Sequence, residues 1–271
     1  MRLSLHQLTV PDISPPELVD IAARLECDHV CFLIGVPGNP GPFRRINTVS
    51  EARELKQRIE AAGMSACNTG TFMAHPDVEL SSYRETLNIA AALGASSVNS
   101  LIQHPDRIRT AEKLRDFAQL AKTYGLAVVL EWYRFSEVTT LKEAVEFLKL
   151  AGSDNIALNA DILHLIRNGE GPSDMAKVDP ALLKYAQICD GPLTLPEDKQ
   201  VEEATANRDF PGAGEFPLVS FIRQLPKSGT VSVEAPVNRM SVKLSAAERA
   251  KGAIDGARKV IAAAKTGTSS A

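Results

Sequence analysis

The stretch 126-LAVVLEWYRFSEVTTLKEAVEFLKLAGSDNIALNAD-161 contains a complete strand, helix and second strand. Residues 126–132 and 155–161 are short runs rich in apolar residues, as expected for buried strands. Residues 141–152 have apolar residues at i, i+3, i+4 and i+7, which predicts an amphipathic helix ending at Gly152. Two strands joined through a helix run parallel, because a parallel return requires a crossover connection.

The same alternation of strand and helix continues along the 271 residues. Further strand-like runs occupy residues 3–10, 28–34, 65–72, 96–102, 184–190 and 230–236. Further helical patterns occupy residues 15–26, 50–63, 82–94, 111–125 and 246–265. Eight strand–helix units predict an α/β fold, a closed (β/α)₈ TIM barrel, formed by residues 1–265 as one domain. The small, polar residues 266–271 are expected to form a disordered tail.

An open, doubly wound sheet is the competing fold. Such sheets usually carry a GxGxxG sequence after the first strand, but the loop here reads 10-VPDISPP-16. The longest irregular segment, residues 191–215, follows the seventh strand, on the face where barrel enzymes have their active sites. Its acidic part, 197-EDKQVEE-203, is interpreted as an exposed loop.

Composition excludes several classes of protein. A net charge of −3 gives no electrostatic basis for binding nucleic acid. The apolar runs are strand-sized and the start, MRLSLHQLTV, is too polar for a signal peptide, so we expect a cytoplasmic protein without a membrane span. The four cysteines show neither CxxC nor zinc-finger spacing, which indicates free buried thiols.

Four late strands each finish near an oxygen-bearing side chain. These are Glu131, Asp161, Gln187 and Glu234, separated by 30, 26 and 47 residues. Because side chains alternate along a strand, Asp161 shares its face with Ala157 and Asn159, and the apolar face is left to pack on helices. We therefore expect all four side chains to point into the mouth of the barrel. A single acid at a strand end would more often cap a helix or lie on the surface.

Three carboxylates converging in one dry mouth would repel one another strongly. A divalent cation is the simplest remedy, and an all-oxygen ligand set favours Mn²⁺, with Mg²⁺ and Co²⁺ as alternatives. Glu131, Asp161, Gln187 and Glu234 are thus the predicted ligands. His164, one helical turn after Asp161, is predicted to contact substrate or transfer a proton, with helix capping as the alternative.

Successive segments resemble the signatures of the xylose isomerase-like TIM barrel family. They are LEW (130–132), NADILHLIRNGEGP (159–172), YAQICDGP (185–192), NRDFPGAGEFPL (207–218) and VSVEAP (231–236). This group contains sugar-phosphate isomerases and epimerases, keto-sugar 3-epimerases, and inosose and 3-dehydroshikimate dehydratases. The resemblance implies the same four metal ligands, and it implies that Arg208, before the FPGAG turn, binds substrate. Many epimerases of the group have histidine where this chain has Gln187. Because glutamine at this position also resembles the 3-dehydroshikimate dehydratases, a dehydratase activity remains an alternative.

The resemblance further implies carbohydrate chemistry through a metal-stabilised enediolate, with Glu131 and Glu234 as the acid/base pair on opposite sides of the substrate. Returning the proton gives an isomerase or epimerase of a small keto-sugar, sugar phosphate or related polyhydroxylated carbonyl compound. Loss of a β-hydroxyl, with His164 as the acid, would instead give a carbon–oxygen lyase. Relatives are often dimers or tetramers, so a homo-oligomer is among the expected states.

Several aromatic side chains are further candidates for the pocket wall. Trp132 and Tyr133 follow Glu131 directly and could contact substrate, although Trp132 could equally pack outside the barrel. His104 and His75 follow strand ends and could touch substrate, while His6, within the first strand, could line the barrel.

Two other functions compete with an isomerase or lyase. A DNA-repair endonuclease on the same barrel would need a three-zinc cluster and a basic face, but the chain has five histidines and a negative charge. A barrel that binds a sugar without catalysis would not need both glutamates.

Overall fold

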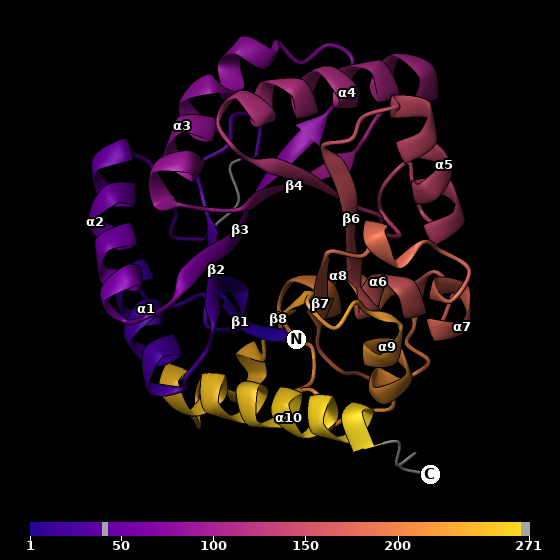
Figure 1. Ribbon diagram of the computed structural model, residues 1–271. Coiled ribbons are helices and arrows are strands. Elements are labelled where there is room, and N and C mark those ends of the chain that lie inside the picture. Colours follow the sequence, from indigo (N-terminus) through magenta and orange to yellow (C-terminus); the bar gives the residue numbers. More distant parts are fainter. Residues whose placement is uncertain (40–42, 267–271) are drawn as a thin grey trace.

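The computed structural model describes residues 1–39 and 43–266, so residues 40–42 and 267–271 lie outside the description. Its strands close into a parallel barrel in which each strand pairs with its neighbours in sequence and β1 pairs with β8 (Figure 1). The predicted TIM barrel is therefore confirmed. The strands are β1 (Arg2–His6), β2 (His29–Leu33), β3 (Ser65–Ala74), β4 (Ser97–Ile102), β5 (Ala127–Glu131), β6 (Ile156–Asp161), β7 (Tyr185–Ile188) and β8 (Thr230–Val233).

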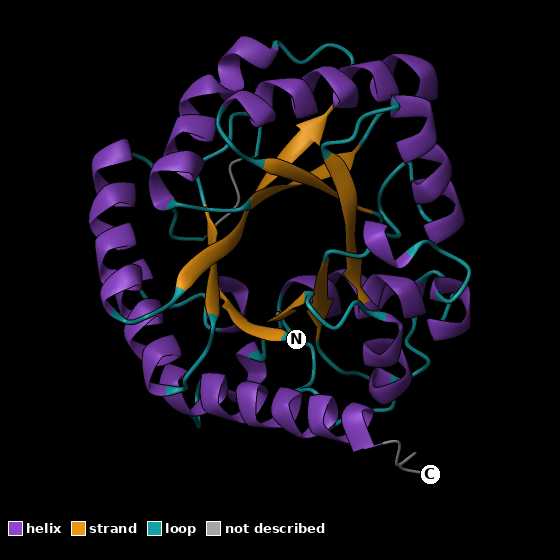
Figure 2. Cartoon of the chain, viewed as in Figure 1, coloured by secondary structure: helices purple, strands orange, loops and turns teal. Residues whose placement is uncertain are grey.

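The helices form a ring outside the strands, as Figure 2 shows. They are α1 (Pro15–Arg24), α2 (Val49–Ala61), α3 (Arg84–Leu93), α4 (Arg107–Thr123), α5 (Leu141–Ala151), α6 (Ile162–Arg167), α7 (Pro172–Met175), α8 (Glu197–Thr205), α9 (Leu218–Gln224) and α10 (Ala246–Thr266). Short 3-10 helices are η1 (Gln7–Thr9), η2 (Leu80–Tyr83), η3 (Pro180–Leu182) and η4 (Asn238–Met240). Thr266, predicted to begin the tail, is the last residue of α10, and the rest of that tail lies outside the described residues.

Helix α5 illustrates how local sequence sets the element boundaries. Thr140 and Glu143 form a capping box, in which each side chain accepts a hydrogen bond from the backbone N–H of the other at 3.1–3.2 Å. Gly152 ends the helix in the left-handed conformation with φ of 63°, which glycine adopts at little cost. Between these ends, the buried stripe that includes Phe147 packs on the barrel. Burying a phenylalanine side chain stabilises the folded state by about 1.5–3 kcal/mol relative to leaving it exposed.

The two faces of each strand bury different kinds of side chain. Val128 and Leu158 belong to the large hydrophobic core between barrel and helices. Val129 and Ala157, which alternate with them, form a separate cluster with Cys31, Cys67 and Tyr185. This alternation places Glu131 and Asp161 on the inner face of the barrel, as predicted.

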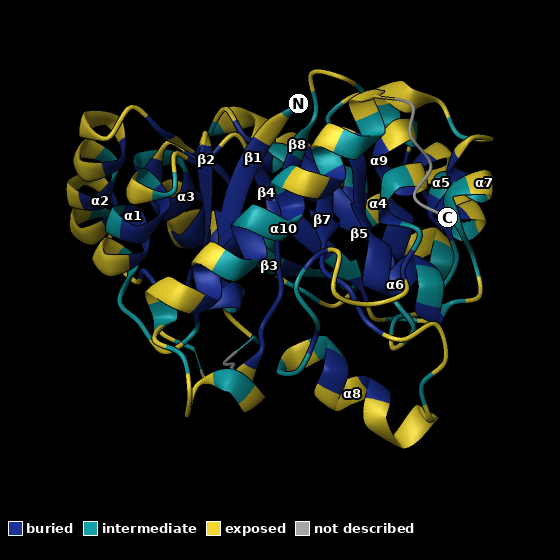
Figure 3. Cartoon of the chain, turned by 90° about the horizontal axis from the view of Figure 1, so that it is seen from below, coloured by how far each residue is buried: buried dark blue, intermediate teal, exposed yellow. Residues whose placement is uncertain are grey.

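The acidic segment 197–203 is helical, so its interpretation as a loop was wrong, although five of its seven residues are exposed as predicted. All of it lies in α8, which stands off the body of the barrel in Figure 3. Glu203 is only 4% exposed, and its carboxylate accepts two hydrogen bonds of 2.6 Å from Arg167 at the end of α6. The ion pair joins residues 36 positions apart in the chain, which explains why local composition did not reveal it.

Among the described helices, none combines the length and apolarity needed to cross a membrane. All four cysteines are buried and free, as their spacing predicted.

Candidate active site

The four predicted metal ligands lie at the carboxyl ends of neighbouring strands. Glu131 and Asp161 are the last residues of β5 and β6, Gln187 lies in β7, and Glu234 directly follows β8. Asp161 stands opposite Gln187 in the register of the two strands. All four side chains belong to residues that are at most 9% exposed. The barrel thus buries three carboxyl groups and one amide at the same end.

Three of these side chains are linked, two by a direct hydrogen bond and the third through Arg208. Gln187 donates a hydrogen bond from Nε2 to Oε2 of Glu234. Nη1 of Arg208 lies 3.0 Å from Oδ2 of Asp161 and 3.7 Å from Oε2 of Glu234. One guanidinium nitrogen therefore stands between the carboxylates of β6 and β8.

His164 connects the carboxylates of β5 and β6. Its Nε2 atom lies 3.7 Å from Oε1 of Glu131 and 3.9 Å from Oδ2 of Asp161. Oδ1 of Asp161 accepts the N–H of Leu163 at 2.8 Å and so caps α6, which holds His164 one turn along the helix. Asp161 thus both begins the helix and faces the histidine that the helix presents.

Arg208 is 3% exposed, and the protein satisfies most of its N–H groups. Nε and Nη2 donate to the carbonyl of Ala204, at 3.2 and 2.9 Å, while Nη1 also donates to the carbonyl of Glu234 at 3.0 Å. In this structure Arg208 is the counter-ion of the carboxylates. Four of its five N–H groups are engaged within the protein, so the contact with substrate predicted for it stays a prediction.

The turn after Arg208 is built around the buried carboxylate of Asp190. Oδ1 accepts the N–H of Phe216 at 2.9 Å, and Oδ2 accepts the N–H of Gly212 at 2.8 Å. A Cβ on Gly214 would lie 2.5 Å from Oδ1 of Asp190, so glycine is required there. This explains the second glycine of the FPGAG sequence, and the backbone pairing of Asp209 with Asp190 fixes the chain next to Arg208.

Burial shifts the pKa values of Glu131, Glu234 and His164 at this end of the barrel. Desolvation, with repulsion from Asp161, raises the pKa of Glu131 to about 7 and that of Glu234 to about 8, although Arg208 opposes both. Desolvation lowers the pKa of His164 to about 4, so its imidazole is neutral at pH 7.

The metal-free protein is expected to lose stability as the pH rises from 6.5 to 8. Glu131 and Glu234 keep protons that the unfolded chain, with carboxyl pKa values of 4.5, has already lost. The folded state therefore binds more protons than the unfolded state, and each rise in pH favours unfolding. His6 and His164, with pKa values lowered from 6.5 to about 3 and 4, act oppositely, and because the unfolded-state pKa is 6.5 their opposing effect fades through the lower part of this range. Urea unfolding at several pH values, with a chelator present, measures how the free energy of unfolding changes with pH.

The double variant Glu131→Gln and Glu234→Gln is the control, because it removes both groups with raised pKa values and should remove the fall in stability between pH 6.5 and 8. A wild-type stability that is constant or rises between pH 6.5 and 8 would contradict this assignment of the buried protons.

The residues present fit a divalent cation. With all groups ionised, three carboxylates face a single guanidinium, which leaves an excess of buried negative charge. Glu131, Asp161 and His164 each offer a ligand atom within 4.8 Å of the others, which marks this place as a candidate metal centre. His164 adds an imidazole to a ligand set that the sequence predicted as oxygen only, and imidazole makes Zn²⁺ a stronger competitor of Mn²⁺.

The two aromatic residues after Glu131 lie in different surroundings. Trp132 is 1% exposed and belongs to the hydrophobic core outside the barrel, as the packing alternative anticipated. The ring of Tyr133 lies 5.5 Å from that of His164, and its hydroxyl group accepts a hydrogen bond from Gln103. Tyr133 is therefore the better candidate for the pocket wall.

Sequence reasoning missed two asparagines behind the carboxylates. Asn99 of β4 donates from Nδ2 to Oε2 of Glu131 at 2.5 Å, and Asn159 of β6 donates to Oε1 of Gln187 at 2.6 Å. Alternation along β6 had placed Asn159 on the inner face, which was the available signal. His6, proposed to line the barrel, lies with Nδ1 3.8 Å from Oε1 of Glu234.

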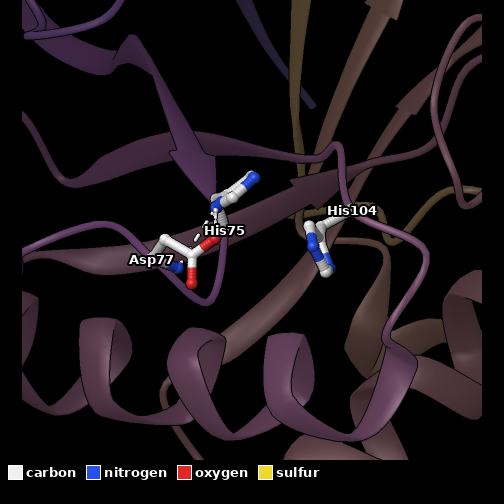
Figure 4. Close-up of side chains that lie close together, drawn as sticks. All are labelled: His75, Asp77 and His104. Carbon is white, nitrogen blue, oxygen red and sulfur yellow. Dashed lines mark hydrogen bonds and ion pairs between the residues drawn. The ribbon is translucent and has the colours of Figure 1, made fainter.

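A second cluster follows β3 and β4, where the sequence contains two His-Pro-Asp segments, 75–77 and 104–106. Figure 4 shows His75 with Asp77 beside it, and His104 on the neighbouring loop. The ring centres of the two histidines are 4.6 Å apart. In each segment the histidine Nδ1 accepts the backbone N–H of the aspartate at 3.1 Å.

These hydrogen bonds determine what the two rings can do. Nδ1 is an acceptor in both, so the proton of each neutral ring is on Nε2. A histidine that binds metal through Nε2 would instead donate from Nδ1. Although His75, Asp77 and His104 are close enough together to suggest a metal site, we interpret the rings as hydrogen-bond donors. The substrate contact predicted for His104 would use its Nε2–H.

Comparison with known proteins places the chain in a family. Residues 19–261 match the family model described as xylose isomerase-like TIM barrel, and the chain belongs to that family.

Among curated proteins, an inosose isomerase of Halalkalibacterium halodurans is 32% identical over 127 residues, which span 45% of this chain and 43% of that protein. The matched segment thus covers less than half of the relative.

Two solved structures share the fold over nearly their whole lengths. The IOLI protein with a binding zinc atom has a TM-score of 0.81 and 17% identity, and the match covers 97% of this chain and 98% of that one. A D-allulose 3-epimerase from Methylomonas sp. has a TM-score of 0.71 and 18% identity, with coverage of 96% and 98%. At these identities the likeness concerns the fold.

Proposed function

We propose that this protein is a divalent-metal-dependent isomerase or epimerase of a small polyhydroxylated ketone. The observation that carries the proposal is the pair of buried carboxyl groups, Glu131 and Glu234. They come from β5 and β8, so β6 and β7 separate them around the barrel and they approach the mouth from different sides. Simple binding of a sugar would not require two such groups.

The pair is suited to moving a proton between the two faces of one carbon atom. One carboxylate accepts the proton from the carbon beside the substrate carbonyl, and the other carboxyl group returns a proton to the opposite face, which inverts that carbon. Return of the proton to the neighbouring carbon gives aldose–ketose isomerisation instead. Acid and base groups act best with pKa values near the working pH, as those of Glu131 and Glu234 are in the metal-free protein.

Glu131, Asp161, Gln187 and Glu234 are the proposed ligands of the ion, with His164 beside them. When bound, the ion would polarise the substrate carbonyl and stabilise the charge of the enediolate. The oxygen-rich ligand set supports Mn²⁺, with Mg²⁺ and Co²⁺ as alternatives. The nearby imidazole and the zinc of the IOLI structure support Zn²⁺ as a further candidate.

The substrate class follows from the site together with the relatives. The inosose isomerase acts, by its name, on a cyclic polyhydroxylated ketone, and the epimerase neighbour acts on the ketose D-allulose. A ketone flanked by hydroxyl groups would suit a site with carboxyl groups on two sides and N–H donors from His75 and His104 on the loops after β3 and β4.

Hydrogen exchange in D₂O tests the proposed function. The metal-free protein is loaded with Mn²⁺, Mg²⁺, Co²⁺ or Zn²⁺ and incubated with an inosose and with D-allulose. We expect metal-dependent exchange at the carbon next to the carbonyl, followed by a new isomer, both visible by NMR. Failure of every metal and substrate to give exchange would contradict the proposal.

A metal-dependent lyase of the inosose or 3-dehydroshikimate dehydratase type is the second candidate. The position of His164 supports it, because Nε2 lies within 4 Å of carboxylates on both β5 and β6 and could donate a proton to a departing hydroxyl group. With a pKa of about 4, His164 is seldom protonated at pH 7 and is therefore poorly suited to act as a general acid. This favours the isomerase over the lyase. New enone or aromatic absorbance in the same incubations would identify a lyase.

A further inference from the structure

A row of buried amides joins the two carboxyl groups proposed for catalysis. Asn99 donates to Glu131 at 2.5 Å, and Gln187 donates from Nε2 to Oε2 of Glu234. Between them, Nδ2 of Asn159 donates to Oδ1 of Asn99 at 3.2 Å and to Oε1 of Gln187 at 2.6 Å. Three amides from β4, β6 and β7 thus form a continuous chain from one carboxyl group to the other.

The chemistry of the two ends sets the direction of every hydrogen bond in this row. An ionised carboxylate, the form that would bind a cation, only accepts hydrogen bonds, so with both carboxyl groups ionised Asn99 and Gln187 turn their NH₂ groups outward to Glu131 and Glu234. Their oxygens then both face inward. A row with an acceptor at each end needs one member that donates in both directions, and Asn159 is that member.

We infer that Asn159 is a positioning residue for the metal centre, an inference that rests on the proposed function. Its two donated hydrogen bonds orient Asn99 and Gln187. In that orientation Gln187 keeps an oxygen lone pair for the ion, and its NH₂ group holds Glu234 in place. Without Asn159, the amide of Gln187 could rotate and present nitrogen, which is no ligand, in place of oxygen.

The unused acceptor of Asn159 supports this role. The residue is 1% exposed, and Oδ1 has no hydrogen-bond partner among the described residues. A buried acceptor without a partner is unfavourable, so packing alone would favour an apolar side chain of similar size. An apolar side chain would lack the two hydrogen-bond donors that Asn159 directs at Asn99 and Gln187, so these donors account for an asparagine at this position.

The test is the Mn²⁺ affinity of the metal-free, full-length protein, measured by titration with detection of free Mn²⁺ by electron paramagnetic resonance. Asn159→Asp removes the donors and adds a charge, and Asn159→Leu removes them without adding one. We expect both variants to bind Mn²⁺ about 10–100-fold more weakly than wild type, the usual effect of losing a group that orients a metal ligand. If Asn159→Asp does not fold, as judged by circular dichroism, Asn159→Leu decides.

The matched control is Asn68→Asp, which places the same substitution at a buried amide of β3. Asn68 is 3% exposed and donates to Ser97 at 2.8 Å, outside the row. The inference predicts Mn²⁺ affinity close to wild type for this control. Wild-type affinity in the folded Asn159 variants, or an equal loss in the control, would overturn the inference alone. Absence of Mn²⁺ binding by wild type would overturn the proposed metal centre as well.

Discussion

Glu234→Gln is expected to lower the turnover of an inosose or ketose by about 10²–10⁴-fold, the usual contribution of a positioned acid or base. Glutamine keeps the size of the side chain and one acceptor oxygen, but it neither takes up nor releases a proton. The expected loss therefore appears in kcat, while substrate binding is retained. Steady-state kinetics of the metal-loaded variant, with exchange in D₂O, measures both.

The control for this substitution is Glu146→Gln, which changes an exposed glutamate on α5 and should leave turnover unchanged. Retained binding with lost turnover would also separate an enzyme from a barrel that only binds sugar. Turnover within tenfold of wild type in Glu234→Gln would show that another group moves the proton.

Arg167→Met is expected to destabilise the fold by about 3–5 kcal/mol, the typical cost of leaving one member of a buried ion pair without its partner. Both side chains of the Arg167–Glu203 pair are 5% exposed. Arg167 also donates to the carbonyls of Pro192 and Leu193, at 2.7 and 3.1 Å, and lies over the ring of Phe216. The substitution therefore loosens α8 and the loop after β7 together. Urea unfolding gives the change in free energy.

Two further variants test whether the lost stability comes from the unpaired buried charge. Arg167→Met combined with Glu203→Met removes both charges, so most of the lost stability should return. Lys122→Met breaks the exposed pair with Asp154 and should have little effect, because water screens such pairs. A single variant at Arg167 that is no less stable than Lys122→Met would contradict the assigned role of the pair.

The fold was predictable because its signals are local and repeated. Stretches such as 141–152 have helical periodicity, a capping threonine and a terminal glycine, and the structure has α5 where the pattern predicts it. Helix α8 was missed because it has just two apolar residues, Val201 and Ala204, and its buried contact is with distant Arg167. Such a contact depends on how separate loops meet.

The convergence of the site was predictable for a related reason. A parallel barrel brings the carboxyl ends of all strands to one mouth. Asp161 and Glu234 could therefore be assigned to the same site before any contact between them was known. The charge balance was less visible, because Arg208 was expected to face substrate and instead lies 3.0 Å from Asp161. Alternation placed Asn159 on the inner face, but its hydrogen bonds to Asn99 and Gln187 join distant strands, and no local sequence pattern encodes them.

Crystals of the protein grown with Mn²⁺, with diffraction recorded at the manganese absorption edge, test the metal centre most directly. We predict one anomalous peak in the barrel mouth, at coordination distance from oxygens of Glu131, Asp161, Gln187 and Glu234. A peak between His75 and His104, or no peak beside the four side chains, would contradict the account.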